Sequence, residues 1–194
     1  MCGRYYFDLE KAFKDTCLAS LLEKSDKIDF AQKEVNPAST ILTIVQNDDE
    51  LGVKLMKWGI ANSYGKQINA RVEGIEQRAF YRSMYMNRCL IPCHGFYEWK
   101  GKQKFYIQNL EKSMFYLAGI YTEQNECLIL TQDAYDCIKS IHHRSPIVIE
   151  KHKINDFFHD PLSSICQNQE LEVSKIDEGP KHIRQFSLFD EDLL

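Results

Sequence analysis

The chain has 194 residues, of which 44% are hydrophobic and 27% are charged. This composition is typical of a globular domain and excludes a fibrous or an unfolded chain. No apolar run approaches the length of a membrane span. The early charges of the first segment, MCGRYYFDLEKAF, exclude a signal peptide.

Charge is unevenly distributed along the sequence. The whole chain has 24 Lys and Arg against 28 Asp and Glu, a net charge of −4. Residues 54–104 hold 10 basic and 3 acidic side chains, a net +7, whereas residues 151–194 hold 5 and 9, a net −4. The central segment can therefore offer a basic surface to phosphates. The alternative, solvated lysines without a partner, fits the charge pattern equally well.

The N-terminal half of the pattern predicts two helices and a pair of strands. Asp8 is placed to cap a helix that runs to about Lys24. Residues 40–46 and 51–58 are typical of strands joined by an acidic turn. A second helix is expected at 75–87.

Strands dominate the second half. We expect them at 89–99, 104–109, 113–121, 126–132 and 147–149, with weaker ones at 171–176 and 181–186, and short helices at 133–140 and near 153–158. The turns between the central strands are too short to hold helices, so the strands pair antiparallel. The sequence therefore predicts an α+β fold: a single domain over 1–194 with a mainly antiparallel, barrel-like sheet, flanking helices and an acidic tail from about 151.

Seven cysteines are scattered along the chain with no CxxC pair. Without a secretory signal they are expected to be reduced thiols of a cytosolic protein. Cys89, Cys93 and His94 have a loose metal-ligand spacing with no second half nearby. We therefore predict no metal site and no cofactor.

Cys2 has the most distinctive chemistry. Methionine aminopeptidase removes Met1 when the second residue is small, which would leave Cys2 with its amine and thiol on adjacent carbons. Such a 1,2-aminothiol condenses with an aldehyde to an imine, which the thiol closes to a thiazolidine. An α-amine has a pKa of about 7.8 and a lysine side chain of about 10.4, so the neutral fraction at pH 7 is roughly 300-fold larger for the α-amine. An incidental cysteine on a frayed end is the alternative.

Two further segments combine polar side chains that suit catalysis. Asn69 can orient a sugar hydroxyl or an amine, and the planar guanidinium of Arg71 can bind two phosphate oxygens at once. The alternative is that both residues only lead the chain into a helix. Glu98 lies among the aromatic residues of GFYEW, where partial burial would raise its pKa and suit it to general acid–base catalysis. The alternative is a Glu98 paired with Lys100 or Arg71.

The segment HHRSP (142–146) adds a titratable ring and a permanent cation. His142 can shuttle a proton near neutral pH, and Arg144 can hold a phosphate. Two adjacent histidines in a polar loop are otherwise plain surface residues.

In chain order, MCGRY, NPA, KWG, NAR-x-E, CLIP-xx-GFYEW and H-x-R-x-P resemble the SRAP family, the SOS-response-associated peptidases or abasic-site processing proteins. The resemblance runs from Cys2 to about Glu150, and VSKID at 173–177 is similar to the family's closing strand. The chain departs from the usual pattern at Val72, Ser145, Cys93–His94 and Asp177, where Ser, Met, Ala-Asp and Asn are common.

The resemblance implies a DNA-damage protein that links covalently to abasic sites in single-stranded DNA. Four residues are then expected to be catalytic: Cys2 closes the thiazolidine, Asn69 orients the sugar and the α-amine, Glu98 transfers protons at the sugar oxygen, and His142 is a proton shuttle. Strand cleavage by β-elimination from the imine is a lyase side activity of the same chemistry.

The resemblance also implies how the DNA is held. Arg4, Arg71 and Arg144 are expected to grip the phosphates that flank the lesion. Trp58 either stacks on a neighbouring base or packs in the core, and both interpretations stay open. We expect a monomer with no membrane partner, in the cytoplasm and, in a bacterium, associated with the nucleoid.

Two other functions stay open at this point. Cys2 could be the nucleophile of a cysteine peptidase, at least for the removal of Met1, with Glu98 and His142 in support. The protein could also be a nonspecific single-stranded DNA-binding module without enzymatic activity.

Overall fold

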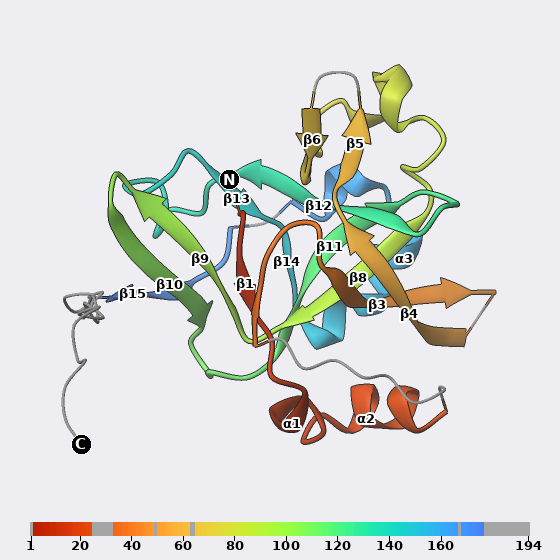
Figure 1. Cartoon of the computed structure of the whole chain (residues 1–194), viewed down its shortest axis with the longest axis horizontal. Helices are drawn as coiled ribbons and strands as arrows, with labels where there is room; N and C mark the ends of the chain where they lie inside the picture. The colour runs from red at the N-terminus through yellow and green to blue at the C-terminus, as the bar shows by residue number, and fades with distance from the viewer. Residues whose placement is uncertain (1, 25–32, 49, 63–64, 167, 177–194) are drawn as a thin grey trace, which may run out of the picture.

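Two β-sheets dominate the computed structural model, which describes residues 2–24, 33–48, 50–62, 65–166 and 168–176 (Figure 1). The strands are β1 (Tyr5–Tyr6), β2 (Glu34–Val35), β3 (Thr40–Asn47), β4 (Glu50–Trp58), β5 (Ile60–Asn62), β6 (Gly65–Gln67), β7 (Asn69–Arg71), β8 (Arg88–Cys93), β9 (Gly95–Lys100), β10 (Gln103–Asn109), β11 (Phe115–Tyr121), β12 (Glu126–Asp133), β13 (Arg144–Pro146), β14 (Val148–Ile149) and β15 (Leu171–Ile176). The helices are α1 (Leu9–Ala12), α2 (Thr16–Glu23) and α3 (Ile154–His159), with 3₁₀ turns η1 (Ile75–Gln77), η2 (Ala79–Tyr81), η3 (Lys151–Lys153) and η4 (Leu162–Ser164).

The larger sheet closes on itself. Its strands follow the order β12-β4-β3-β8-β11, and β11 pairs back to β12. The pairing of β12 with β4 is parallel, with Cys127 opposite Trp58, and the other four are antiparallel. Closure pairs the strand edges that an open sheet would leave exposed. The expected α+β fold with a barrel-like, mainly antiparallel sheet is confirmed.

The smaller sheet has the order β15-β10-β9-β1-β2. Only His94 separates β8 in the larger sheet from β9 in the smaller one, so the chain passes directly between the sheets there. β1 is an inner strand, with Tyr5 opposite both Phe96 and Val35. Figure 1 shows β1 between the β9–β10 ribbon and the closed sheet.

One cluster of buried side chains joins the two sheets. The ring centroids of Tyr5 from β1 and Trp58 from β4 lie 5.5 Å apart, and neither side chain is more than 1% exposed. The N-terminal strand is thereby fixed to the closed sheet by side-chain packing, while it pairs with β9 and β2 in the smaller sheet.

The helix predicted from Asp8 to Lys24 is two helices. Asp8 caps α1 by accepting the N–H of Lys11 at 3.5 Å, as expected. A second cap then restarts the helix, because Asp15 accepts the N–H groups of Cys17 and Leu18, both at 3.1 Å.

The predicted helix at 75–87 is also wrong. It is replaced by η1 and η2, because Arg78 between them has extended backbone angles, φ −89° and ψ 118°. The strand expected at 89–99 is β8 and β9, which lie in different sheets. Residues 133–140 contain turns in place of the expected helix.

The other expected elements are confirmed within a few residues: β3, β4, β10, β11, β12, β14, α3 and β15. The weak strand at 181–186 lies outside the described residues. None of the described helices is long and apolar enough to span a membrane.

Candidate active site

Cys2 lies at the start of the segment that becomes β1. The N–H of Tyr97 donates to the carbonyl of Arg4 at 2.9 Å, which extends the pairing of β1 with β9 toward the N-terminus. The side chain of Cys2 is fully buried, and its Sγ lies 3.8 Å from the same Arg4 carbonyl oxygen. Cys2 is therefore held inside the fold, and the alternative of a frayed end is wrong.

Glu98 lies on β9 and is 2% exposed. Burial raises the pKa of its carboxyl group. The positive charge at the amino end of the chain lowers this pKa, but the effect of burial is larger. Burial raises the pKa of the Cys2 thiol, and the negative charge of Glu98 raises it further. Glu98 thus acts electrostatically on Cys2. Burial has the largest effect on the pKa of Glu98, and the charge that opposes this effect is that of the amino terminus rather than that of Lys100 or Arg71.

Asn69 connects the closed sheet to the N-terminal residue. It starts β7, which pairs parallel with β12, and its Nδ2 donates to the carbonyl oxygen of Cys2 at 3.0 Å. This bond fixes which end of the amide is the nitrogen. The Oδ1 of Asn69 is buried and has no hydrogen-bond partner among the residues that the structure describes. That oxygen is able to accept a hydrogen bond from an amine or a sugar hydroxyl.

His142 is half-buried in the loop before β13. Its Nδ1 lies 2.9 Å from the backbone nitrogen and 3.1 Å from the carbonyl oxygen of Arg144, so the Arg144 backbone binds this ring nitrogen in either tautomer. Burial lowers the pKa of His142, and the positive charge at the amino end of the chain lowers it further. The ring is therefore neutral at pH 7, and it stacks on His143 with centroids 4.4 Å apart.

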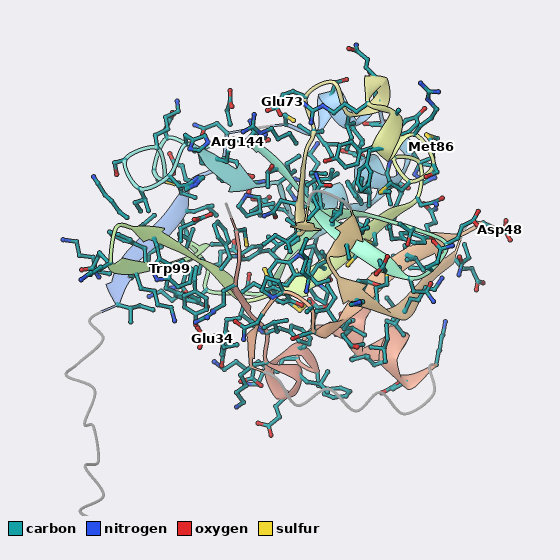
Figure 2. All side chains as sticks on the ribbon, turned by 45° about the horizontal axis from the view of Figure 1, so that its top comes forward. Glu34, Asp48, Glu73, Met86, Trp99 and Arg144 are labelled. Carbon is teal, nitrogen blue, oxygen red and sulfur yellow. The ribbon has the colours of Figure 1, made fainter. Side chains whose placement is uncertain are left out.

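Arg144 is buried, and both of its terminal nitrogens are bound within the protein. Its two terminal nitrogens bind both carboxylate oxygens of Glu73 at 2.8 and 2.7 Å, Asp133 at 2.7 Å and the carbonyl of Thr131 at 2.7 Å. Figure 2 shows Arg144 and Glu73 together at the top of the view. These contacts join β13 to β12 and to the segment after β7, and the phosphate contact expected of Arg144 stays a prediction.

Trp58 is fully buried, and its Nε1–H donates to the carbonyl of Ile68 at 2.9 Å. A ring with no exposed face cannot stack on a base. Of the two interpretations of Trp58, the core residue is the one that agrees with the structure.

The other two arginines are accessible. Arg71 ends β7 as an exposed side chain. The side chain of Arg4 is 36% exposed; its Nη1 binds Glu34 at 3.3 Å, and its guanidinium lies 5.5 Å from the ring centroid of Trp99. Both remain suited to a phosphate contact.

Sequence reasoning missed the acidic partners of Arg144 and Arg4. No pattern in the sequence pairs Glu73 with Arg144, or Glu34 with Arg4 and Lys104. The contact between Glu73 and Arg144 spans 71 residues and the contact between Glu34 and Lys104 spans 70. No local pattern signals a pair so far apart in sequence.

The structure brings Cys2, Asn69, Glu98 and His142 around the amino end of the chain. Within the described part of the chain, no group of three or more His, Cys, Asp or Glu side chains is placed to hold a metal ion. The family model for SOS response associated peptidase (SRAP) matches residues 1–180. The chain belongs to the SRAP family.

Several relatives of this SRAP protein have descriptive names. It is 31% identical to the abasic site processing protein YoaM of Bacillus subtilis, in an alignment that covers 77% of this chain and 75% of YoaM. It is 27% identical to the abasic site processing protein YoqW of the same organism, in an alignment that covers 94% of this chain and 96% of YoqW. The resemblance inferred from the motifs is confirmed.

Solved structures share the fold of this SRAP protein. A crystal structure of a protein from Bacteroides thetaiotaomicron matches with a TM-score of 0.73 at 20% identity, covering 91% of this chain and 93% of that one. A protein from Bordetella bronchiseptica matches with a TM-score of 0.70 at 16% identity, covering 90% and 99%. At these identities the likeness concerns the fold alone.

Proposed function

We propose that this SRAP protein binds single-stranded DNA and captures abasic sites as a covalent thiazolidine on Cys2, once Met1 has been removed. The observation that carries the proposal is the seating of Cys2: its carbonyl is held by Asn69, and its thiol lies within the field of the buried Glu98. The names of the relatives YoaM and YoqW, abasic site processing proteins, supply the substrate class.

The proposed reaction begins with the α-amine of Cys2. Its nitrogen attacks the C1′ aldehyde of the ring-opened deoxyribose and forms a carbinolamine. Glu98, whose raised pKa favours the protonated form, donates a proton to the carbinolamine oxygen, and water leaves to give the imine. The sulfur then bonds to the carbon of this protonated imine, the thiol proton passes to the Glu98 carboxylate, and the nitrogen regains its lone pair. The net change is the loss of one water.

Asn69 and His142 assist this reaction at its two ends. The buried Oδ1 of Asn69 accepts a hydrogen bond from the α-amine or a sugar hydroxyl and so orients the two reactants. The neutral His142 moves a proton to or from the opened sugar through its Nε2. Arg4 and Arg71 bind the flanking phosphates.

One observation argues against the cysteine-peptidase alternative. A peptidase nucleophile is a thiolate, which requires a thiol pKa lowered by a nearby cation. Burial and the charge of Glu98 instead raise the pKa of the Cys2 thiol. A neutral thiol suits a reaction in which the amine attacks first and the sulfur adds to an imine.

The test uses uracil-containing single-stranded DNA from which the uracil has been removed. Wild-type protein is expected to give a heat-stable, gel-shifted adduct whose mass is the sum of both partners minus one water. Cys2→Ala should abolish the stable adduct and retain only an imine that borohydride traps, because an amine remains. Glu98→Gln should slow adduct formation by about 10²-fold or more.

Cys17→Ala is the matched control, because Cys17 is an exposed free thiol away from the site. Its adduct yield should equal that of the wild type. A stable adduct of equal yield with Cys2→Ala, or none with wild-type protein whose mass shows that Met1 is gone, would refute the proposal. Lesion-independent binding alone would favour the nonspecific DNA-binding module, and Cys2-dependent peptide turnover the peptidase.

A further inference from the structure

Two cations, two aromatic rings and one carboxylate form a cluster beside the candidate active site. They are Arg4 ahead of β1, Glu34 on β2, Tyr97 and Trp99 on β9, and Lys104 on β10. Neighbouring strands bring them together, since β10, β9, β1 and β2 are consecutive in the smaller sheet. Arg4 is two residues from Cys2, about 7 Å along an extended chain. Figure 2 labels Glu34 and Trp99, far from the Arg144–Glu73 pair.

Glu34 bridges the two cations of this cluster. Its Oε1 lies 3.3 Å from Nη1 of Arg4 and 2.6 Å from Nζ of Lys104. Two positive charges therefore share one negative charge, and the cluster keeps a net charge of +1.

The aromatic rings hold the cations in place. Nζ of Lys104 lies 4.1 Å from the ring centroid of Tyr97 and 5.7 Å from that of Trp99, and the guanidinium of Arg4 lies over the same Trp99 ring at 5.5 Å. Cations positioned over ring faces are stabilised by the ring quadrupole. The rings thus help to hold the two donors side by side, in addition to their bonds to Glu34.

Glu34 is the most accessible charged member of the cluster. Its side chain is 41% exposed, against 36% for Arg4 and 11% for Lys104. The Nε–H of Arg4 has no acceptor among the described residues, so the guanidinium is only partly satisfied. An anion with several oxygens would satisfy this pair of cations more fully than one carboxylate oxygen does.

We propose that Arg4 and Lys104 form a binding site for one DNA phosphate, and that Glu34 occupies this site in the free protein. When single-stranded DNA binds, a phosphate oxygen replaces Oε1 of Glu34 as the acceptor for both cations, and the carboxylate turns to water. The inference rests on the proposed function, because it places this phosphate next to the sugar that Cys2 captures. Glu34 thereby weakens the binding of DNA by the cost of breaking its two ion pairs.

A purely structural role for Glu34 makes a different prediction. If its only effect were to tie β2 to the smaller sheet, its loss would leave DNA binding unchanged or weaken it. Competition with phosphate predicts that the loss of the Glu34 charge strengthens binding. The direction of the change in affinity therefore separates the two roles.

The experiment measures the affinity for a single-stranded oligonucleotide with one tetrahydrofuran residue, which has no aldehyde, by fluorescence anisotropy at several salt concentrations. Glu34→Gln is expected to bind about two- to fivefold more tightly at about 0.1 M salt, since partly exposed ion pairs are individually weak. Lys104→Gln is expected to bind more weakly and to reduce the slope of log affinity against log salt by about 0.7. Glu34→Gln should gain less when combined with Lys104→Gln.

Glu172→Gln is the matched control, because this substitution removes the same charge from the same sheet and also breaks an ion pair, that of Glu172 with Lys112 at 3.4 Å. Its change in affinity measures the effect of net charge alone. The proposal is overturned if folded Glu34→Gln binds no more tightly than Glu172→Gln. If Glu34→Gln does not fold, an unchanged salt slope for Lys104→Gln overturns it.

The probe cannot react, so this test is separate from crosslinking. If the variants change affinity as expected but the wild type forms no adduct with a true abasic site, the phosphate site stands and the crosslinking function fails. If adducts form but the variants behave like the control, only the phosphate site fails.

Discussion

Glu98 is a carboxylic acid kept from water on a strand of aromatic residues. Its burial raises its pKa above the ordinary value of 4.5. An ionised carboxylate in such a place costs folding free energy, so its presence on β9 is explained by chemistry rather than by stability. The same burial raises the pKa of Glu98 toward neutral pH, which a proton donor at this site requires.

Glu98→Gln is therefore expected to stabilise the protein in a pH-dependent way. The folded pKa is raised, so the contribution of Glu98 to stability is fully present below pH 4.5 and is lost as the pH rises through the folded value. The melting temperature of Glu98→Gln should equal that of the wild type near pH 4 and exceed it at pH 8. Each kcal/mol corresponds to about 2–4 °C in a chain of this size. Calorimetry across this range checks the sign, and equal melting temperatures at both pH values would contradict it.

Arg144 provides the second prediction at this scale. Replacing it by Lys removes the fork that binds both oxygens of Glu73 while it also reaches Asp133 and Thr131. We expect a loss of about 1–3 kcal/mol in the free energy of unfolding, measured by urea denaturation. Arg144→Gln also removes the charge, so in folded protein it tests the phosphate contact expected of Arg144. A slope of log affinity against log salt reduced by about 0.7 would support that contact, and an unchanged slope would contradict it.

The strand that positions the nucleophile is β1, which pairs with β9. At the start of β9, Gly95 leaves room for the Tyr106 side chain of β10. A Cβ at Gly95 would lie 2.4–2.5 Å from three atoms of the Tyr106 side chain. The hydroxyl of that tyrosine donates to the carbonyl of His94 at 3.0 Å, in the one-residue link between the sheets. Gly95 thus lets Tyr106 pack over the point where the chain passes from the closed sheet to β9.

Gly95→Ala is expected to cost about 1–3 kcal/mol in the free energy of unfolding, because the ring must move. The cost should be smaller in a Tyr106→Leu background, which a double-mutant cycle of denaturation curves measures. Gly52→Ala is the control, since its Cβ would meet no atom closer than 3.8 Å. Equal costs of Gly95→Ala in both backgrounds would show that the ring is not the cause.

At the scale of the whole molecule, one core joins the closed sheet to the smaller sheet. Cys2 and Tyr5 from the smaller sheet belong to the same buried cluster as Trp58 from the closed one. The candidate site lies between them, since Asn69 and His142 come from the closed-sheet side and Glu98 from β9. A site shared in this way requires the sheets to fold as a unit.

We therefore expect the two sheets to unfold in one transition. The chain has two tryptophans, Trp58 on β4 and Trp99 on β9, so each sheet has its own fluorophore. In Trp99→Phe and in Trp58→Phe, the urea midpoint from fluorescence should equal the midpoint from far-UV circular dichroism. A fluorescence midpoint that differs from the dichroism midpoint in either variant would divide the chain into two domains.

The sequence by itself predicted most of the longer strands and the family, and it singled out the four candidate residues near the amino end of the chain. Each of these has a local signature: alternation along β3 and β4, the spacing of CLIP-xx-GFYEW, and a cysteine at position 2. Local signatures are readable because side-chain direction repeats along a strand and short motifs fix the backbone.

Only the tertiary structure decided which partners surround each of these side chains. Arg144 binds Glu73, Trp58 is buried in the core, and Lys104 joins Arg4 through Glu34, although 70 residues separate Lys104 from Glu34. Such partners are set by strand order and sheet closure, and the energy of an ion pair depends on burial and distance rather than on position in the chain. For that reason the charge pattern of 54–104 predicts a basic segment but not the arginine or lysine that acts.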